Sequence, residues 1–326
     1  MARVYIADDD LTGIKDKVIL ITGTNHLTTL SSSYKDYPQH LKAPILTLQP
    51  TGASSGIGRA TAQLCLDLGA KVVIGDLNPP NPDFTNTTNI TFQHTDVTQW
   101  ESLRALFTHA MTQHGHIDHV FANAGINPTP SFLEVKLNEA GEVQPPNMRT
   151  INVNFLAVIN TIHLANAYMT KLAPANEKEN GGTGSIVLAA STSSFQTFST
   201  GDYTIAKHGV LGMLRAFVEP FQLQGKVRIN AVAPSWTDTG IMPAALFQSV
   251  GVGVQSPEVV ARSVVLLFAD EKRHGDVLYS WDGNYREINN SPGGLLEGAE
   301  RLLDNAANEQ NAILRIREAF LKAKGA

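Results

Sequence analysis

Short apolar runs recur along the chain and predict the strands of a sheet. Seven of them, rich in aliphatic and β-branched residues, lie at 17–21, 71–75, 90–94, 117–122, 185–190, 227–232 and 277–281. Continuous apolar runs of this length are typical of strands buried on both faces. Between them lie longer stretches with helical character, at 60–68, 101–114, 148–171, 202–223 and 257–268. Strands alternating with helices predict one α/β domain, a doubly wound parallel sheet with helices on both faces.

The two ends of the chain fall outside this alternation. Residues 1–16 are interpreted as a polar lead-in, and residues 286–326 as a C-terminal helical extension to a main domain at 1–285. Two sets of apolar residues in the extension each share one helical face, which leaves open packing on the core or a role as a lid or subunit contact. They are Leu295, Ala299, Leu302 and Ala306, and Ile313, Ile316 and Phe320.

The pattern breaks once inside the main domain. Residues 24–50 have no sustained periodicity, and the pair Thr22-Gly23 before them recurs as Thr51-Gly52. We therefore interpret residues 24–52 as an insertion, with two explanations open: a retained intron or a genuine surface loop. Codons for the first pair can supply the GT that starts an intron, and codons for the second pair can supply the AG that ends one.

The insertion separates a predicted strand from a glycine-rich turn. We expect the run at 17–21 to form the central strand and residues 24–50 to bulge outward as a loop. A competing strand at 45–48 is disfavoured, because Pro50 lacks the N–H group that a sheet ladder needs.

The composition narrows the class of protein. The 326 residues are 43% hydrophobic and 17% charged with a net charge of −5, so no basic field attracts nucleic acid or an anionic membrane. The single cysteine, Cys65, excludes an intrachain disulfide, fits a reducing compartment and lies on an apolar helix face where we expect it to be buried. No signal peptide or membrane-spanning run is recognised. We therefore expect a cytoplasmic protein with no nucleic-acid or membrane partner.

Tyr203 and Lys207 form a first candidate pair for chemistry. Residues four apart lie one above the other on a helix face. An ammonium beside a phenol favours the phenolate and would lower the pKa of Tyr203 from its usual ~10. Tyr203 could then exchange a proton with an alcohol as general base or acid. The spacing alone is common on solvated helices, so the pair needs support from elsewhere in the chain.

The glycine-rich turn TGASSGIG at residues 51–58 supplies that support. Its glycines let the backbone approach a pyrophosphate, and the N-terminus of the following helix adds free N–H groups. Asp76 ends the next predicted strand, 18 residues after Gly58. That offset suits an acid that binds the ribose hydroxyls of NAD and repels the 2′-phosphate of NADP. The alternatives are an ordinary tight turn and, for Asp76, a helix or turn cap.

With these pieces in place, the chain resembles the short-chain dehydrogenase/reductase family over residues of about 15–285. The resemblance implies a Rossmann-type sheet, NAD as cofactor, interconversion of a secondary alcohol and a ketone by hydride transfer, and a homodimer or homotetramer. Its motifs occur in family order, each at a strand end or on the matching helix. They are TGASSGIG, Asp76, Asp96-Val97, Asn123-Ala124-Gly125, Asn154, Ser191, Tyr203 with Lys207, and Pro234 to Thr239.

The resemblance assigns four residues to catalysis. Tyr203 would be the acid/base, and Lys207 would bind the nicotinamide ribose and lower the pKa of Tyr203. Ser191 would hydrogen-bond the substrate oxygen, and Asn154 would hold a water that relays protons to Lys207. Tyr203 and Lys207 would thus contact the cofactor as well as the substrate.

The other motif residues would bind the cofactor only. The turn would hold the pyrophosphate, the strand ends that follow would hold the adenosine, and the segment after Pro234 would hold the carboxamide. They are Gly52, Ser54, Ser55, Gly56, Ile57, Gly58, Asp76, Leu77, Asp96, Val97, Asn123, Ala124, Gly125, Pro234 and Thr239.

Some positions are ambiguous or depart from the family pattern. Ser193 and Ser194 compete for the serine role, and Asn152 for the asparagine role. Ser235 stands where the family usually has glycine, which puts the local cofactor geometry in doubt. No metal site is expected, because the nearby histidines lack a completing carboxylate or cysteine and are interpreted as surface residues. These are His109, His114, His116 and His119.

We expect an NAD-dependent alcohol dehydrogenase or carbonyl reductase. The alternative is a catalytically impaired dinucleotide-binding protein, a redox sensor or assembly partner, because the insertion precedes the turn. An NADP-dependent reductase remains a third hypothesis if Asp76 has another role. Apolar residues after Pro234 favour an apolar or ring-containing alcohol as substrate. They are Trp236, Ile241, Met242, Leu246 and Phe247.

Overall fold

The computed structural model describes most of the chain. The described residues are 2–23, 56–80, 84, 87–129, 132–173, 184–239, 247 and 251–302, with single residues at 312, 315, 316 and 319. The loop expected at 24–50 and the turn residues Gly52, Ser54 and Ser55 lie outside them.

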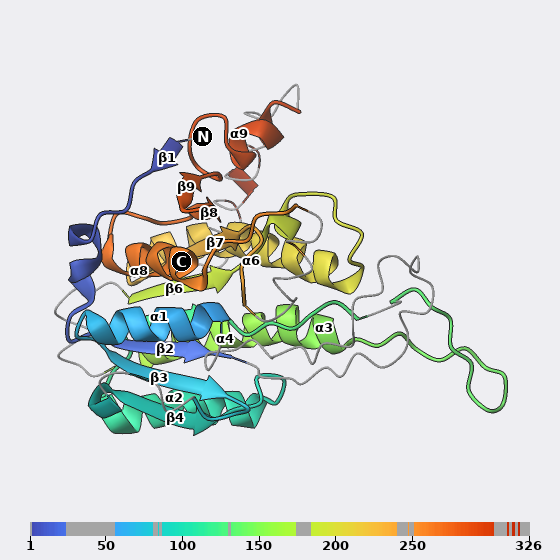
Figure 1. Cartoon of the computed structure of the whole chain (residues 1–326), viewed down its shortest axis with the longest axis horizontal. Helices are drawn as coiled ribbons and strands as arrows, with labels where there is room; N and C mark the ends of the chain where they lie inside the picture. Colours follow the sequence, from blue (N-terminus) through green and yellow to red (C-terminus); the bar gives the residue numbers. More distant parts are fainter. Residues whose placement is uncertain are drawn as a thin grey trace.

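Seven parallel strands form the body of the sheet, as the apolar runs predict (Figure 1). β2 lies between β3 and β5, which confirms the run at 17–21 as the central strand with a shift of one residue. The strand order reverses between β2 and β5, and a crevice forms at the carboxyl ends of strands at such a point. The strands are β2 (Val18–Thr22), β3 (Lys71–Asp76), β4 (Ile90–His94), β5 (His119–Ala122), β6 (Gly184–Ala189), β7 (Val227–Pro234) and β8 (Val277–Trp281).

Two antiparallel strands extend the sheet beyond β8. β9 (Asn284–Glu287) pairs with β8, and β1 (Ala2–Val4) pairs with β9. The 3-10 helix η1 (Asp9–Ile14) then packs against α8 (Pro257–Ala269) and buries its apolar side chains. The interpretation of residues 1–16 as a lead-in is therefore wrong. Three strand residues are too few for a periodic signal, and only the free edge of β9 gives them a pairing partner.

Alternate residues of the central strand enter two separate cores. Val18 and Leu20 pack on the side of α2, α4 and α6, whereas Ile19 and Ile21 pack on the side of α1 and α8. Side chains alternate across a strand, so a strand that is apolar at every position needs helices on both faces. The predicted doubly wound α/β architecture is thereby confirmed. The helices are α1 (Gly56–Asp67), α2 (Trp100–His114), α4 (Ala157–Asn166) and α6 (Asp202–Gln224).

The long helix predicted at 148–171 is present but not uniform. It begins with α3 (Arg149–Ile151) and passes through a π-helical turn, η4 (Asn152–Leu156), before α4. A second π-helical turn, η5 (Ala167–Lys171), ends it. π turns inside α-helices often mark functional positions, and η4 carries Asn154.

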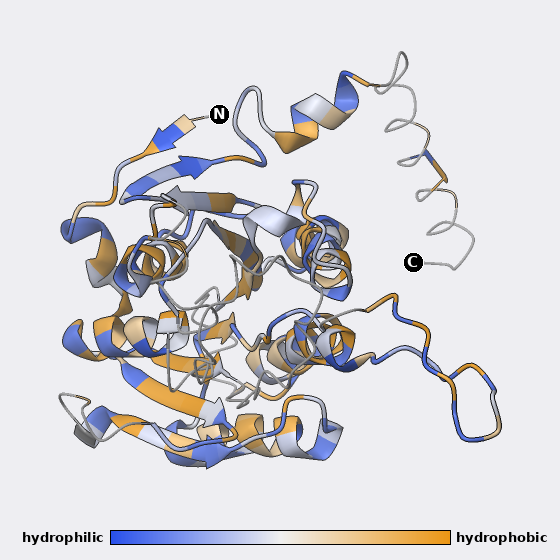
Figure 2. Ribbon diagram, turned by 45° about the vertical axis from the view of Figure 1, so that its right-hand side comes forward, coloured by the Kyte–Doolittle hydropathy of each residue, from blue (hydrophilic) through white to orange (hydrophobic). Residues whose placement is uncertain are grey.

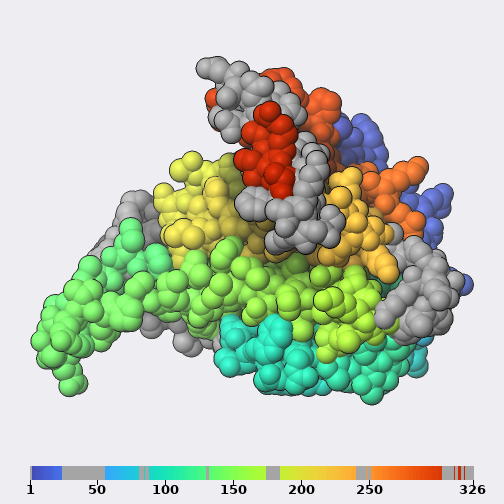
Figure 3. Space-filling view, turned by 180° about the vertical axis from the view of Figure 1, so that it is seen from behind, coloured from blue at the N-terminus to red at the C-terminus, as the bar shows by residue number. Residues whose placement is uncertain are grey.

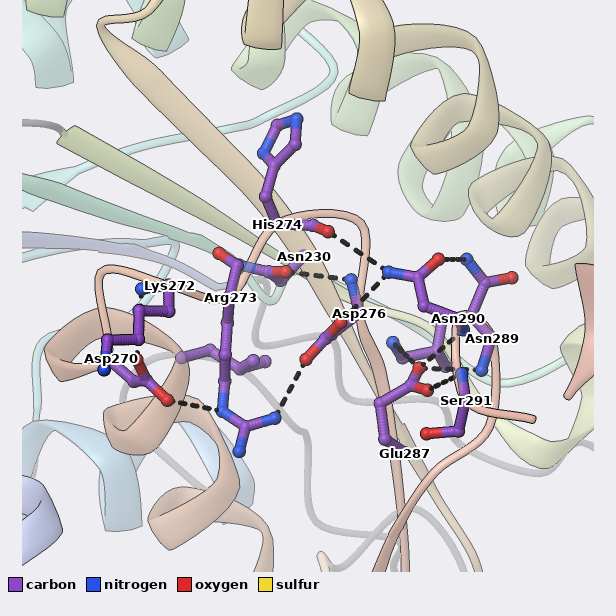
Figure 4. A network of polar contacts seen from close by, with 12 residues as sticks. Asn230, Asp270, Lys272, Arg273, His274, Asp276, Glu287, Asn289, Asn290 and Ser291 are labelled. Atoms are coloured by element: carbon purple, nitrogen blue, oxygen red, sulfur yellow. Dashed lines mark hydrogen bonds and ion pairs between the residues drawn. The ribbon is translucent and has the colours of Figure 1, made fainter. Parts of the chain in front are cut away.

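A polar network joins Glu287, the last residue of β9, to the start of β8 and to the residues that follow β9 (Figure 4). Glu287 Oε1 accepts hydrogen bonds from the backbone N–H groups of Val277 (3.1 Å), Asn289 (2.7 Å) and Asn290 (3.1 Å), and Oε2 accepts from that of Ser291 (2.6 Å). Burial raises the pKa of Glu287, but these hydrogen bonds outweigh burial and hold the pKa below its ordinary value. A charged carboxylate therefore organises the turn that follows the sheet.

Most described residues from α9 onward lie outside the core, whereas residues 287–289 at the start of the C-terminal extension are buried. In α9 (Leu295–Glu300), Leu295 packs against the core, but Ala299 is exposed, and Leu302 beyond the helix is 84% exposed. Ile316 is also exposed. Among the described residues of these faces, Leu295 packs on the core and the others are exposed, so packing on the core and a role as a lid or subunit contact both stay predictions.

An arm at residues 132–148 projects from the body where the sequence indicates only a loop (Figures 1 and 3). Leu137 and Val143 pair across it as an antiparallel bridge. Leu133, Val135, Leu137 and Val143 are all exposed. Figure 2 shows hydrophobic and hydrophilic positions mixed along the arm. The arm thus carries apolar side chains away from the two cores.

Candidate active site

A cavity lies at the carboxyl ends of β5, β6 and β7, beside the first turn of α1. This is the edge of the sheet at which the strand order reverses. The fold brings eight of the predicted catalytic and cofactor-binding residues to its lining. They are Ile57, Asn123, Gly125, Ser191, Tyr203, Lys207, Pro234 and Thr239.

The glycine-rich turn meets the segment after β7. Gly56 begins α1 with φ +52°, and a Cβ at this position would lie 3.0 Å from Thr239 Cβ. A side chain would therefore be strained by its backbone and crowded by its neighbour. The free N–H groups of the first turn of α1 consequently lie next to the described end of the segment that carries Thr239.

Asp76 and Leu77 lie at the carboxyl end of β3, outside the cavity lining. Asp76 is fully buried, and its Oδ1 accepts a hydrogen bond from the backbone N–H of Asn78 at 3.2 Å. The carboxylate therefore caps the turn after β3, which is the alternative that the sequence left open. Its binding of a ribose stays a prediction.

Asp96 and Val97 follow β4. Asp96 Oδ1 accepts from the backbone N–H (2.9 Å) and the hydroxyl (2.7 Å) of Thr98, close to the start of α2. Val97 is fully buried in the core on the α2 side. Both residues fix the loop between β4 and α2, and their contact with an adenine stays a prediction.

Asn154 fixes the loop that follows β5. Its Oδ1 accepts from the backbone N–H of Ile126 (2.8 Å), and its Nδ2 donates to the carbonyl of Ile126 (2.9 Å). Asn154 is fully buried, whereas Asn152 is exposed, so the geometry favours Asn154. Both ends of its amide hold the backbone just after Gly125. The relay of protons through a water at this residue stays a prediction.

Ser191 lies at the start of the 3-10 turn η6 (Thr192–Ser194). Its Oγ accepts from the backbone N–H of Ser193, and its own N–H donates to Ser194 Oγ, each at 3.2 Å. The Ser191 side chain also acts on the Tyr203 hydroxyl as a hydrogen-bonding neighbour that lowers its pKa. This contact favours Ser191 over its two neighbours.

Tyr203 and Lys207 lie on the first two turns of α6. Lys207 Nζ is 5.6 Å from the centre of the Tyr203 ring and donates to the carbonyl of Ala189 at 2.6 Å. Burial lowers the pKa of Lys207 to about 8. Burial also raises the pKa of Tyr203, and the hydrogen bond with Ser191 offsets only part of that rise. Burial therefore places the pKa of Tyr203 above its ordinary value in this arrangement, in which the ammonium faces the ring, and a lowering of that pKa by Lys207 stays a prediction.

Two features near Tyr203 were missed from the sequence. Asp202 is fully buried at the start of α6, and both its oxygens accept from the backbone N–H of Thr129 (3.0 and 3.2 Å). An acid at the first position of a predicted helix is a signal that could have found it. Thr200 and Phe198 also line the cavity, but they lie in an irregular segment that gives no periodic signal.

Aromatic side chains form one side of the cavity. Trp236 lies between Phe198 and Phe247, with ring centres 6.0 and 5.0 Å apart, respectively. All three line the cavity, as was expected of Trp236 and Phe247. The other expected residues, Ile241, Met242 and Leu246, lie outside the described residues.

The departure at Ser235 needs no unusual backbone. Among the described residues, the only non-glycine positions with positive φ are Asp16 and Asp282. Ser235 also donates its N–H to the carbonyl of Ser280 at 2.9 Å, as a strand residue would. A serine is therefore accommodated where the family usually has glycine.

The histidines are not all surface residues. His119 lies inside β5, 4% exposed, with Nδ1 3.1 Å from Ser185 Oγ and its ring stacked on Phe268. Burial lowers its pKa to about 3, so it is a neutral core residue. The interpretation of His119 as a surface residue is wrong, because a position inside a strand covered on both faces is buried.

Two further observations bear on the class of site. In the described part of the chain, no group of three or more histidine, cysteine, aspartate or glutamate side chains is placed to hold a metal ion. No helix there combines the length and the apolar character that a membrane span requires. Cys65 is buried as expected, and burial raises the pKa of its thiol well above the ordinary value.

Known proteins share both the sequence and the architecture. Residues 49–247 match the short chain dehydrogenase family. The chain is 38% identical over 305 residues to the short-chain dehydrogenase/reductase ascJ of Acremonium egyptiacum, across 93% of this chain and 90% of that protein. It is 30% identical over 255 residues to the cis-4-hydroxycyclohexanecarboxylate dehydrogenase of Sinomonas cyclohexanicum, across 73% of this chain and 95% of that protein.

A solved structure has a similar fold. The crystal structure of levodione reductase superposes with a TM-score of 0.59 at 21% identity, covering 82% of this chain and 96% of that one. The match to the family begins at residue 49, close to the end of the interpreted insertion. The cavity, its Tyr–Lys pair and these matches lead to one conclusion: the chain belongs to the short-chain dehydrogenase/reductase family of oxidoreductases.

Proposed function

We propose that this protein is an NAD-dependent oxidoreductase that interconverts a ring-containing secondary alcohol and the corresponding ketone. One observation carries the proposal. Ser191, Tyr203 and Lys207 line one cavity, with the Lys207 ammonium beside the Tyr203 ring, and the first turn of α1 lines the same cavity.

Proton transfer in this site is assigned to Tyr203. Its raised pKa keeps the hydroxyl protonated at neutral pH, the form in which a general acid donates to a carbonyl oxygen. In reduction, Ser191 and Tyr203 hydrogen-bond the substrate oxygen, and Tyr203 gives it a proton as a hydride reaches the carbonyl carbon. In oxidation, Tyr203 must first lose its own proton, and the phenolate then takes the hydroxyl proton of the substrate as the hydride leaves the same carbon. The nicotinamide, when bound, supplies the hydride acceptor or donor.

Lys207 stabilises the phenolate that Tyr203 leaves after donating its proton. With a pKa of about 8, Lys207 is charged at neutral pH, and it is held next to Tyr203 by its hydrogen bond to Ala189. Asn154 holds the loop after β5 in place through its two hydrogen bonds to Ile126. These groups are fixed before substrate binds, which lowers the entropy cost of reaching a reactive geometry.

NAD is the proposed cofactor because of Asp76. A buried carboxylate at the end of β3 disfavours a 2′-phosphate and suits two ribose hydroxyls. The first turn of α1 fits a pyrophosphate, and Pro234 and Thr239 would hold the nicotinamide end.

The aromatic side of the cavity supports the substrate class. Phe198, Trp236 and Phe247 offer ring faces and edges to an apolar substrate. One relative is named for a hydroxylated cyclohexane ring, which fits the same class. We further propose a cytoplasmic homodimer or homotetramer, in keeping with the family.

A substrate screen tests the proposal. Purified protein is mixed with NAD or NADP and a panel of cyclic and acyclic secondary alcohols, and with NADH or NADPH and the matching ketones, while nicotinamide absorbance is followed. Turnover of cyclic substrates with NAD, lost in Tyr203→Phe, is the expected result. Binding of NADH without turnover of any substrate would favour the impaired dinucleotide-binding protein instead.

A further inference from the structure

The segment that follows β7 carries both the cofactor side and the substrate side of the cavity. Trp236 faces the aromatic residues, and Thr239 packs against Gly56 at the glycine-rich turn. After Ser235, whose N–H still donates to the carbonyl of Ser280 on β8, this segment leaves the ladder that fixes the sheet. Something else must set its position.

Gln255 makes the contacts that do so. Its backbone N–H donates to the carbonyl of Trp236, and its carbonyl accepts from the N–H of Asp238, both at 2.9 Å. Its side-chain Nε2 lies 3.1 Å from Thr237 Oγ1 and 3.1 Å from the carbonyl of Ser280, and donates to both. Gln255 thus acts as a short parallel strand beside Thr237.

The side-chain contacts join the segment to the sheet itself. Ser280 is buried on β8, and its carbonyl also accepts from the N–H of Ser235 at 2.9 Å. Thr237 Oγ1 in turn donates to the carbonyl of Ser235 at 2.8 Å. One amide group of Gln255 therefore links β8 to the middle of the segment.

Stability alone does not explain a glutamine at this position. Gln255 is 5% exposed, and its Oε1 is buried with no hydrogen-bond partner among the described residues. An unsatisfied buried acceptor destabilises the folded protein, and an apolar side chain of the same shape would avoid that cost. Buried polar atoms are normally hydrogen-bonded, and exceptions are expected next to functional sites.

We propose that Gln255 is a positioning residue for hydride transfer, one that holds residues 235–239 so that Trp236 and Thr239 keep their places on the two sides of the cavity. Gln255 does not itself line the cavity, so it acts through these residues. The inference rests on the proposed function. Gln255 is therefore given a role in the reaction although it lies away from the reacting atoms.

Gln255→Met is the test variant, because methionine keeps the length of the side chain and loses the Nε2 donors. We expect the dissociation constant of NADH and the KM of a cyclic alcohol each to rise about 10-fold or more, since small misplacements near the chemistry have large effects. We expect Tm to change little, because the variant also removes the unsatisfied acceptor. Gln224→Met, at the exposed last residue of α6, is the matched control and should leave all values unchanged.

A double-mutant cycle separates positioning from general damage. Thr237→Val removes the side-chain oxygen to which Gln255 donates, and the double variant with Gln255→Met should be no worse than the poorer single variant. Additive losses would overturn the proposal, as would Gln255→Met with wild-type NADH affinity and KM. If Gln255→Met fails to fold, Thr237→Val decides alone: it must weaken NADH binding for the proposal to stand.

Failure of the proposed function gives a different result. A wild-type protein that neither binds NADH nor turns over any substrate would refute the proposed function and the inference that rests on it. A wild-type protein that does both, with an unchanged Gln255→Met, refutes only the inference.

Discussion

Replacing Lys207 by methionine removes an ammonium that the fold buries beside Tyr203. Lys207 is 5% exposed, and among the described residues its recorded hydrogen-bond partner is the carbonyl of Ala189. Burial lowers its pKa from an ordinary 10.5 to about 8. The folded protein therefore holds the charged form at a cost in stability that the unfolded chain does not have.

The sign of the pH dependence follows from this lowered pKa. Between about pH 8 and 10.5 the unfolded chain keeps the Lys207 proton and the folded protein has lost it. Stability therefore rises with pH through this window, and the full cost applies below pH 8. A shift from 10.5 to about 8 corresponds to on the order of 3 kcal/mol, at about 1.4 kcal/mol per pKa unit.

Urea unfolding at several pH values between 7 and 10 measures the effect. Other groups titrate in this range, so the useful quantity is the wild-type unfolding free energy minus that of Lys207→Met. We expect this difference to rise with pH, and its total increase from pH 7 to pH 10 to approach about 3 kcal/mol. Lys226→Met, at an exposed lysine before β7, should give a flat difference. A flat or falling difference for Lys207→Met would refute the argument that its ammonium is buried at a cost.

Three further predictions concern activity. Tyr203→Phe keeps the ring and removes the hydroxyl, so turnover on an accepted substrate should fall by ~10²–10⁴-fold with an unchanged circular dichroism spectrum; near wild-type rates would show that another group transfers the proton. Asp76→Ala should bring the kcat/KM values for NAD and NADP closer together, and a wild-type preference for NADP would contradict the role of Asp76. Deletion of residues 24–52 should tighten NADH binding measured by fluorescence, because β2 would lead directly into the turn; equal affinities would identify the segment as a tolerated loop.

Much of the site could be predicted because its residues lie at the ends of recognisable strands. Ser191, Asn123 and Pro234 each follow an apolar run, and parallel strands bring their carboxyl ends to one edge of the sheet. Tyr203 and Lys207 needed only the period of a helix to be placed side by side. The fold and the central part of the site were therefore accessible from local patterns and chain order.

The electrostatic environment of those residues was not accessible in the same way. The sequence shows that Lys207 is near Tyr203, but not that the ammonium faces the ring while burial acts on the hydroxyl. His119 was likewise judged by its neighbours in the chain, although its strand is covered on both faces. Burial depends on elements far apart in the sequence, and it dominates both of these pKa shifts.

The sequence by itself determined the α/β class, the central strand and the residues that could perform acid–base chemistry, because strand, turn and helix signals are local. Only the tertiary structure decided how the chain ends complete the sheet, since β1 has no partner until β9 is in place. It also decided that Gln255 hydrogen-bonds to the segment carrying Trp236 and Thr239, and that Gly56 lies against Thr239. Those contacts join residues remote in the chain, and no periodic pattern of side chains encodes them.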